Sequence, residues 1–175
     1  MILTAYAYQN MTDWYGDIPY TEALKADANP SIIFPKYDSQ ESIYMDVIKQ
    51  LKDANLMIDE SANIGGADII FNGNMTMWKK FANSLLLRIY MRMSMVKPDI
   101  AKAGIEEIIA NPATYPIISS NSENAFKYWI PGDAEYRSPY WMNPVDAPTQ
   151  ENVAGEFMID FLKARSDQRL PIYAE

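Results

Sequence analysis

The sequence predicts an all-α fold made of helical repeats that carry long irregular loops. Several segments have apolar residues at every third or fourth position, which is the period of a helix, and none alternates convincingly as a strand would. Two amphipathic segments also lie 34 residues apart, the period of tetratricopeptide-like helix pairs. The positions that correspond at this spacing are Tyr44, Val47 and Leu51 with Trp78, Phe81 and Leu85. With 175 residues, 49% of them hydrophobic and 22% charged, the chain can bury the core of one domain.

The first helix is predicted over residues 1–12, which begin without a capping residue. An isolated helix this short is marginal in water, so we expect an upstream segment to pack against it. Gly16 and Pro19 then break the helical pattern, and residues 13–36 are predicted to form a loop. The apolar residues that share the helical spacing are Ile2, Leu3, Tyr6 and Ala7.

The second helix is predicted over about residues 39–59. Asp38, followed three positions later by Glu41, has the form of a capping box at its start. Its apolar residues recur at helical spacing, which predicts one buried face. They are Ile43, Val47, Leu51, Ala54 and Ile58.

The third helix is predicted to start after Asn74, a good capping residue, and to be the central one. Both of its sides are apolar, so we expect burial nearly all round and core filling by the methionines. Arg88 and Arg92 are predicted to have structural roles, pairing with buried carboxylates or loop carbonyls. The residues on the two sides are Trp78, Phe81, Leu85, Ile89 and Val96, and Leu86, Leu87, Met91, Met93 and Met95.

Pro98 is predicted to lie in the first turn of a fourth helix, which ends at Asn111 and Pro112. Residues 112–148 contain six prolines and no clear period, which indicates an irregular region. A closing helix is predicted over about residues 150–165, with Thr149 as its cap. The predicted division is thus a helical-repeat part over about 1–111, an aromatic-rich loop region over about 112–148 and the closing helix.

Composition argues against several functions. The net charge is −8, from 15 Lys and Arg against 23 Asp and Glu, and such a surface repels nucleic acid. The chain has no Cys and no His, which removes thiol and Ser–His nucleophiles and the usual zinc and haem ligands. We therefore expect no cofactor and no metal. No apolar stretch approaches the roughly 18–20 residues of a membrane span, and an export signal would have to lie outside this sequence.

The loop region contains the candidate binding site. Tyr and Trp rings suit stacking on the apolar faces of sugars, and nearby polar groups can bond to the hydroxyls. The alternative is that the rings pin a long loop onto the helices. A second alternative is glycosidase chemistry by Asp133 and Glu135, although carboxylates at this spacing usually just face solvent. The predicted ligand-binding residues are Trp129, Tyr136, Arg137, Tyr140, Trp141 and Asn143; no residue is predicted to be catalytic.

A second aromatic and acidic group lies earlier in the chain. It consists of Asp13, Trp14, Tyr15, Asp17 and Tyr20. Because Gly16 and Pro19 are typical of a rigid turn, we expect this group to pack its rings inward and to serve the fold.

Four segments, in the right order, together resemble the SusD/RagB family of outer-membrane nutrient-binding lipoproteins. Residues 13–23 closely resemble a family signature, and the other segments resemble the starts of two repeat helices and a late turn. The segments are 13–23 (DWYGDIPYTEA), 35–44 (PKYDSQESIY), 68–92 (beginning DIIFNGN) and 167–171 (DQRLP). Family members are roughly three times this length, so the resemblance implies that residues 1–175 are part of one SusD-like domain.

The resemblance implies a lipid-anchored protein at the cell surface, in the outer membrane, whose signal and anchor Cys lie outside this sequence. Such a protein captures glycans, or in some members peptides, without cleaving them. Its partner would be a SusC-type TonB-dependent transporter, which the helical repeats would face. A helical-repeat scaffold that binds only proteins and, less favoured, a glycoside hydrolase stay open as alternatives.

Overall fold

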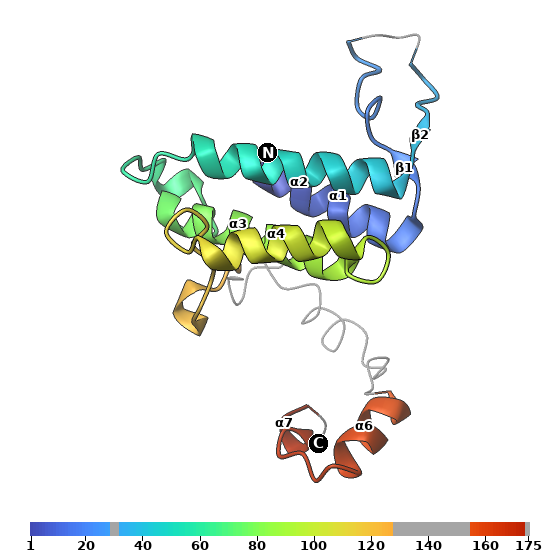
Figure 1. The fold of residues 1–175 in the computed structure, drawn as a ribbon, viewed down its shortest axis with the longest axis vertical. Coiled ribbons are helices and arrows are strands. Elements are labelled where there is room, and N and C mark those ends of the chain that lie inside the picture. Colours follow the sequence, from blue (N-terminus) through green and yellow to red (C-terminus); the bar gives the residue numbers. More distant parts are fainter. Residues whose placement is uncertain (29–31, 128–154, 174–175) are drawn as a thin grey trace, which may run out of the picture. The chain divides into compact units, whose positions relative to one another are not determined.

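In the computed structural model the described residues are 1–28, 32–127 and 155–173. They belong to two compact units, residues 1–127 and 128–175. Helices dominate the described residues, which confirms the all-α class (Figure 1). The elements of the first unit are α1 (Ile2–Tyr15), β1 (Ile18–Pro19), β2 (Tyr37–Asp38), α2 (Gln40–Met57), η1 (Gly65–Ala67), α3 (Met75–Met93), α4 (Pro98–Ala110) and η2 (Asn121–Glu123).

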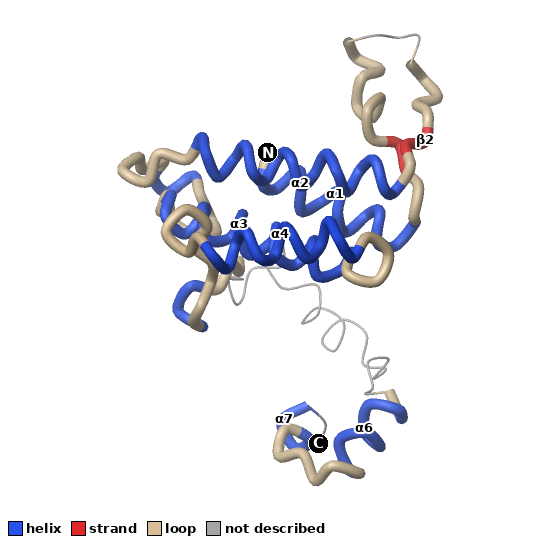
Figure 2. The backbone as a smooth tube through the Cα atoms, viewed as in Figure 1, coloured by secondary structure: helices blue, strands red, loops and turns tan. Residues whose placement is uncertain are grey.

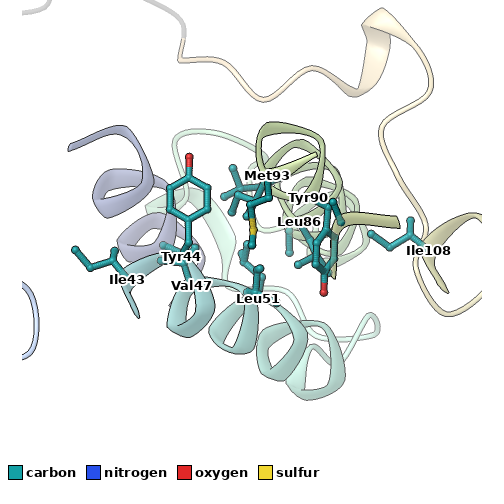
Figure 3. Packing of buried hydrophobic residues seen from close by; sticks show 14 of the residues in the cluster. Ile43, Tyr44, Val47, Leu51, Leu86, Tyr90, Met93 and Ile108 are labelled. Atoms are coloured by element: carbon teal, nitrogen blue, oxygen red, sulfur yellow. The ribbon is translucent and has the colours of Figure 1, made fainter. Parts of the chain in front are cut away.

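The core of the first unit lies between α1, α2, α3 and α4. Helix α3 is central, as predicted, because it packs on α2 on one side and on α4 on the other, while α1 packs on α2. Leu51 of α2 and Leu86 and Ile89 of α3 are completely buried in this core. Figure 3 shows Leu51 and Leu86 pointing toward one another from neighbouring helices.

Helix α2 forms where the spacing predicts it, and Ile43, Val47 and Leu51 are buried as expected. Its cap differs from the prediction. Ser39, rather than Asp38, is the N-cap: its hydroxyl oxygen accepts a hydrogen bond from the backbone N–H of Ser42 at 3.2 Å. Asp38 instead accepts from the backbone N–H groups of Tyr20 and Thr21, at 3.2 and 2.7 Å.

Asn74 caps α3 as predicted, because its side-chain oxygen accepts from the N–H of Met77 at 3.1 Å. The prediction that this helix extends to Val96 was wrong. Helix α3 ends at Met93, because Pro98 cannot continue it. Val96 and Met95 therefore lie beyond the helix and are exposed, Met95 to 90%. Met91 is exposed as well, so core filling is confirmed only for Met93.

Helix α1 continues to Tyr15, three residues past the predicted end. Gly16, at φ 73°, then reverses the chain, and its N–H donates to the carbonyl of Thr12 at 2.8 Å. A short antiparallel pair follows, in which Ile18 of β1 is paired with Asp38 of β2. Strands of two residues are too short to show alternation, so the sequence did not predict them. Figure 2 shows the pair in red at one end of the helices.

Helix α4 starts at Pro98, as predicted, and packs closely against α3. A Cβ added at Gly104 would come within 2.2 Å of the ring of Tyr90, so a larger residue there would force the ring to move. Ile108 is buried in the core cluster that also contains Tyr90, whereas Ile109 is exposed.

The second unit contains α6 (Glu156–Lys163) and α7 (Leu170–Tyr173). Helix α6 falls within the predicted closing helix but ends two residues before the predicted end, and Gly155 precedes it without a side-chain cap. The predicted cap Thr149 and residues 150–154 lie outside the described residues. Leu162 is buried, and the rings of Phe157 and Phe161 are 6.2 Å apart, centre to centre.

Candidate functional site

The six predicted ligand-binding residues all fall in the range 128–154, outside the described residues. The same holds for Asp133 and Glu135, on which the glycosidase alternative rests. The site in the aromatic loop therefore stays a prediction. It consists of Trp129, Tyr136, Arg137, Tyr140, Trp141 and Asn143.

A second candidate site lies where the end of α1 meets the start of α2 and the end of α3. At its centre is Asp13, whose side chain is only 8% exposed. Its carboxylate forms an ion pair with Arg92 of α3 and accepts hydrogen bonds from the hydroxyl of Tyr44 and from the side chain of Gln9. Pairing of Arg92 with a buried carboxylate confirms the role predicted for it, while Arg88 is exposed.

The network holds Tyr44 and Arg92 each in one charge state. Burial, followed by the hydrogen bond to Asp13, raises the pKa of Tyr44 above its ordinary value, so the phenol remains a proton donor. Hydrogen bonds with Tyr44 and Asp13 raise the pKa of Arg92, which stays a cation. The three side chains thus hold a fixed arrangement across three helices.

A small cleft of about 130 Å³ opens beside this network. Two cations line it, and both are paired with carboxylates: Arg92 with Asp13, and Lys97 with Glu41 at 2.7 Å. The cleft is therefore balanced in charge, and apolar atoms make up most of its surface. Its lining residues are Gln40, Glu41 and Tyr44 from α2, and Arg92, Met93, Val96 and Lys97 from the end of α3 and the turn after it.

The turn at Gly16, which follows α1, is tied by hydrogen bonds to the start of α2. The side-chain nitrogen of Gln40 donates to the carbonyl of Thr12 at 2.6 Å, and the backbone N–H of Gln40 donates to Asp17 at 2.9 Å. The hydroxyl of Thr12 also donates to the carbonyl of Gly16 at 2.6 Å. These bonds fix the backbone next to the cleft.

The rings of the early aromatic group do not all pack inward as predicted. Tyr20 does, meeting the ring of Tyr8 edge-on at 4.6 Å and bonding to Asp46. Trp14 and Tyr15 are instead 82% and 74% exposed on the last turn of α1. The prediction was wrong for these two because Asp13, rather than a ring, occupies the helix face that points into the protein.

Sequence reasoning missed this cleft because its lining comes from segments about 50 residues apart. Among the described residues, no group of three or more acidic side chains could hold a metal ion. No helix in the described ranges is both long and apolar enough to cross a bilayer.

A family model described as starch-binding and associating with the outer membrane, the SusD-like model, matches residues 1–175. No curated protein is significantly similar to the chain.

Three similar solved structures are a chitin-binding protein, a Bacteroides vulgatus protein assigned to the outer membrane and nutrient binding, and a SusD homologue from Bacteroides fragilis. They are 28%, 31% and 27% identical to the chain, with TM-scores of 0.78, 0.75 and 0.72. They match 98%, 97% and 95% of this chain, and this chain covers 34%, 37% and 34% of theirs. The chain thus spans about a third of the length of these structures. The match of the family model over every residue, on a helical fold shared with these proteins, shows that the chain belongs to the SusD-like family of starch-binding, outer-membrane-associated proteins.

Proposed function

We propose that this protein captures glycans at the cell surface without cleaving them and passes them to a SusC-type TonB-dependent transporter. The match of the starch-binding family model to residues 1–175 carries the proposal. A neighbour described as a chitin-binding protein supports a carbohydrate ligand as well. A peptide ligand is the alternative within the same role.

In this proposal a lipid anchor outside the sequence holds the protein at the outer membrane. The units 1–127 and 128–175 are parts of one SusD-like domain, which the single family match across both supports. Its helical repeats occupy about residues 1–111, its irregular aromatic region about 112–148 and its closing helix about 150–165. The repeats face the transporter.

Binding would rest on stacked rings and a few orienting polar groups. In the aromatic loop the rings of Trp129, Tyr136, Tyr140 and Trp141 supply apolar area, while Arg137 and Asn143 bond to hydroxyls. Each ring contact contributes about 1 kcal/mol beyond the burial of its area. That burial and the polar contacts supply the rest of the roughly 4–8 kcal/mol that a Kd in the millimolar to micromolar range requires. Such weak binding permits transfer to a transporter.

The test is affinity electrophoresis of the full-length protein in gels that contain different polysaccharides, with an assay for released reducing ends. Capture predicts retarded migration in at least one gel and no new reducing ends. A glycoside hydrolase would release them, and activity would fall in Asp133→Asn or Glu135→Gln. A scaffold that binds only proteins would migrate unretarded in every gel.

A further inference from the structure

Helix α1 has an apolar side that faces away from the core. Its fully buried residues are small or polar, namely Ala5, Gln9 and Thr12, and the partly buried Ile2 and Tyr8 flank them. Successive side chains on a helix point about 100° apart, which places a row of four exposed residues on the opposite side. This outer row of α1 consists of Leu3 (52% exposed), Ala7, Met11 (46%) and Trp14 (82%). A helix side that meets water normally carries polar residues, so the outer row is typical of a covered side.

Helix α4 shows the opposite arrangement. Helices α1 to α4 pack in the order of the chain, each on the next (Figure 1), so that α1 and α4 are the two outer helices of these four. The row of α4 opposite its buried residues consists of Asp99, Lys102, Glu106 and Ala110, and Lys102 pairs with Glu106 at 3.9 Å. In a stack of helical repeats the end that meets water has a polar outer face. By this criterion α4 can end the stack, whereas α1 needs a further helix on its outer row.

An apolar groove adjoins the outer row at the start of α1. Leu3, the first residue of the row, lines this groove, which has a volume of about 510 Å³. Met57 and Ile58 at the end of α2, and Met75 and Trp78 at the start of α3, supply other parts of its wall. Met57 is 73% exposed. The outer row and the groove therefore form one apolar surface, joined at Leu3.

The chemistry of this surface suits another helix. The outer row runs about 17 Å along α1, and side chains at helical spacing pack between those of a second helix. The side chains of Leu3, Ala7 and Met11 offer no strong hydrogen-bonding group to orient a sugar hydroxyl. A helix that lies on a membrane surface uses Lys and Arg to hold lipid head groups, and α1 contains neither. The expected occupant is the apolar face of a helix.

We propose that the outer row of α1 and the adjoining groove dock the helix that precedes α1 in the full-length protein. The solved neighbours are about three times as long as this chain, so a full-length relative has the residues to supply such a helix. The order of packing also favours it: each of α1 to α4 packs on the next along the chain, which puts the preceding helix on the outer side of α1. Trp14 then belongs to a contact within the protein and is not a sugar-stacking ring. This inference does not depend on glycan binding.

Oxidation of the native full-length protein by hydrogen peroxide tests whether the row is covered. Met11 and Met45 of α2 are nearly equally exposed in residues 1–175, at 46% and 41%. Because peroxide must reach the sulfur atom, a docked helix should slow sulfoxide formation at Met11 about tenfold relative to Met45. Peptide mass spectrometry measures both rates, and similar rates at the two methionines would refute the docking.

Photo-crosslinking identifies the occupant. The full-length variant Met11→p-benzoylphenylalanine, irradiated without any other protein, should form crosslinks to a peptide that precedes residue 1. Crosslinks to residues 128–175 or to a second copy would overturn the proposal. Protection of Met11 that appears only when the transporter is added would overturn it as well.

Two matched substitutions test whether the contact stabilises the protein. Ala7 and Ala103 are both exposed, and each is the sixth residue of its helix, on the side away from the core. In the full-length protein Ala7→Gln should lower the melting temperature by about 3 °C, because a larger polar side chain has no room under a docked helix. Ala103→Gln should stay within about 1 °C of the parent, since its side chain extends into water. Equal shifts in the two variants would contradict a covered outer row.

Discussion

The indole nitrogen of Trp78 donates a hydrogen bond of 2.6 Å to Asp68, across the loop that precedes α3. The same carboxylate accepts from the backbone N–H groups of Ile70, Phe71 and Gly73, at 3.0, 3.2 and 2.9 Å. One buried side chain thus satisfies four donors and fixes where α3 begins. The stability of this loop should depend on Asp68 more than on any exposed carboxylate nearby.

Replacing Asp68 by Ala should lower the free energy of unfolding by about 3 kcal/mol, since several buried donors lose their acceptor. Urea unfolding followed by circular dichroism measures this change. Asp59→Ala is the control, because Asp59 is exposed and its carboxylate, within the part of the chain that the structure describes, bonds to Ser61 alone. Equal losses in the two variants would refute the importance of the buried network.

The contribution of Asp68 should also depend on pH. Burial by itself would raise its pKa, but the hydrogen bonds from Ile70, Gly73, Trp78 and Phe71 outweigh burial and lower the pKa below its ordinary value of 3.8. A carboxyl whose pKa is lower in the folded state stabilises the fold fully above its unfolded pKa. The stabilisation is lost as pH falls below about 4 toward the folded pKa.

The difference in unfolding free energy between the parent and Asp68→Asn checks this dependence. It should be constant between pH 7 and 5 and shrink below pH 4. A difference that grows on acidification would mean that the folded protein raises the pKa of Asp68 instead.

Gly73 is predicted to tolerate no side chain. It lies at φ +82°, and a Cβ would come within 2.2 Å of the side-chain oxygen of Asn63 and 2.6 Å of the backbone nitrogen of Gly65. Gly73→Ala should therefore destabilise the protein by about 2 kcal/mol or more. Gly16→Ala tests the backbone strain alone, because Gly16 has φ +73° and open space around it.

Thermal melting of the two variants, together with Gly66→Ala, should give a graded result. Gly66 has neither a positive φ nor a close neighbour, so its replacement should change the melting temperature least. Gly16→Ala should fall between the other two. If Gly73→Ala were as stable as Gly66→Ala, the close packing of this loop would be wrong.

Arg92→Ala should destabilise the first unit by about 1.5 kcal/mol, because it leaves the buried carboxylate of Asp13 without its cation. The loss is moderate since Arg92 itself is 45% exposed. Arg88, one turn earlier on α3 and exposed, is the matched control and should have almost no effect. Chemical unfolding of both variants measures the difference, and a similar loss in each would contradict a specific role for the pair.

The sequence predicted those helices whose buried face can be identified from the spacing of apolar residues alone. Leu51, Leu86 and Ile89 are core residues because their faces are apolar over several turns, and Asn74 caps α3 because its side chain acts locally. The cap of α2 was misassigned because the side chain of Asp38 instead accepts hydrogen bonds from a segment 17 residues away. Local patterns carry no information about such a long-range partner.

The candidate cleft was beyond prediction for the same reason. The exposure of Trp14 depends on which residue of α1 faces Arg92. That residue is Asp13, because it forms an ion pair with Arg92, 79 residues later in the chain. Once that ion pair is known, the outward position of Trp14 follows from helix geometry. The aromatic loop was predicted from composition, and Trp141 and its neighbours remain a prediction.

Capture without cleavage is tested most directly by titrating the full-length protein, and its Tyr140→Ala/Trp141→Ala variant, with the polysaccharide that retards the parent in gels. Isothermal titration calorimetry should give a Kd for the parent in the micromolar to millimolar range. The variant should bind at least tenfold more weakly, and chromatography of the sugar should show an unchanged chain length. Shortened sugar chains, or a variant that binds as tightly as the parent, would contradict capture by these rings.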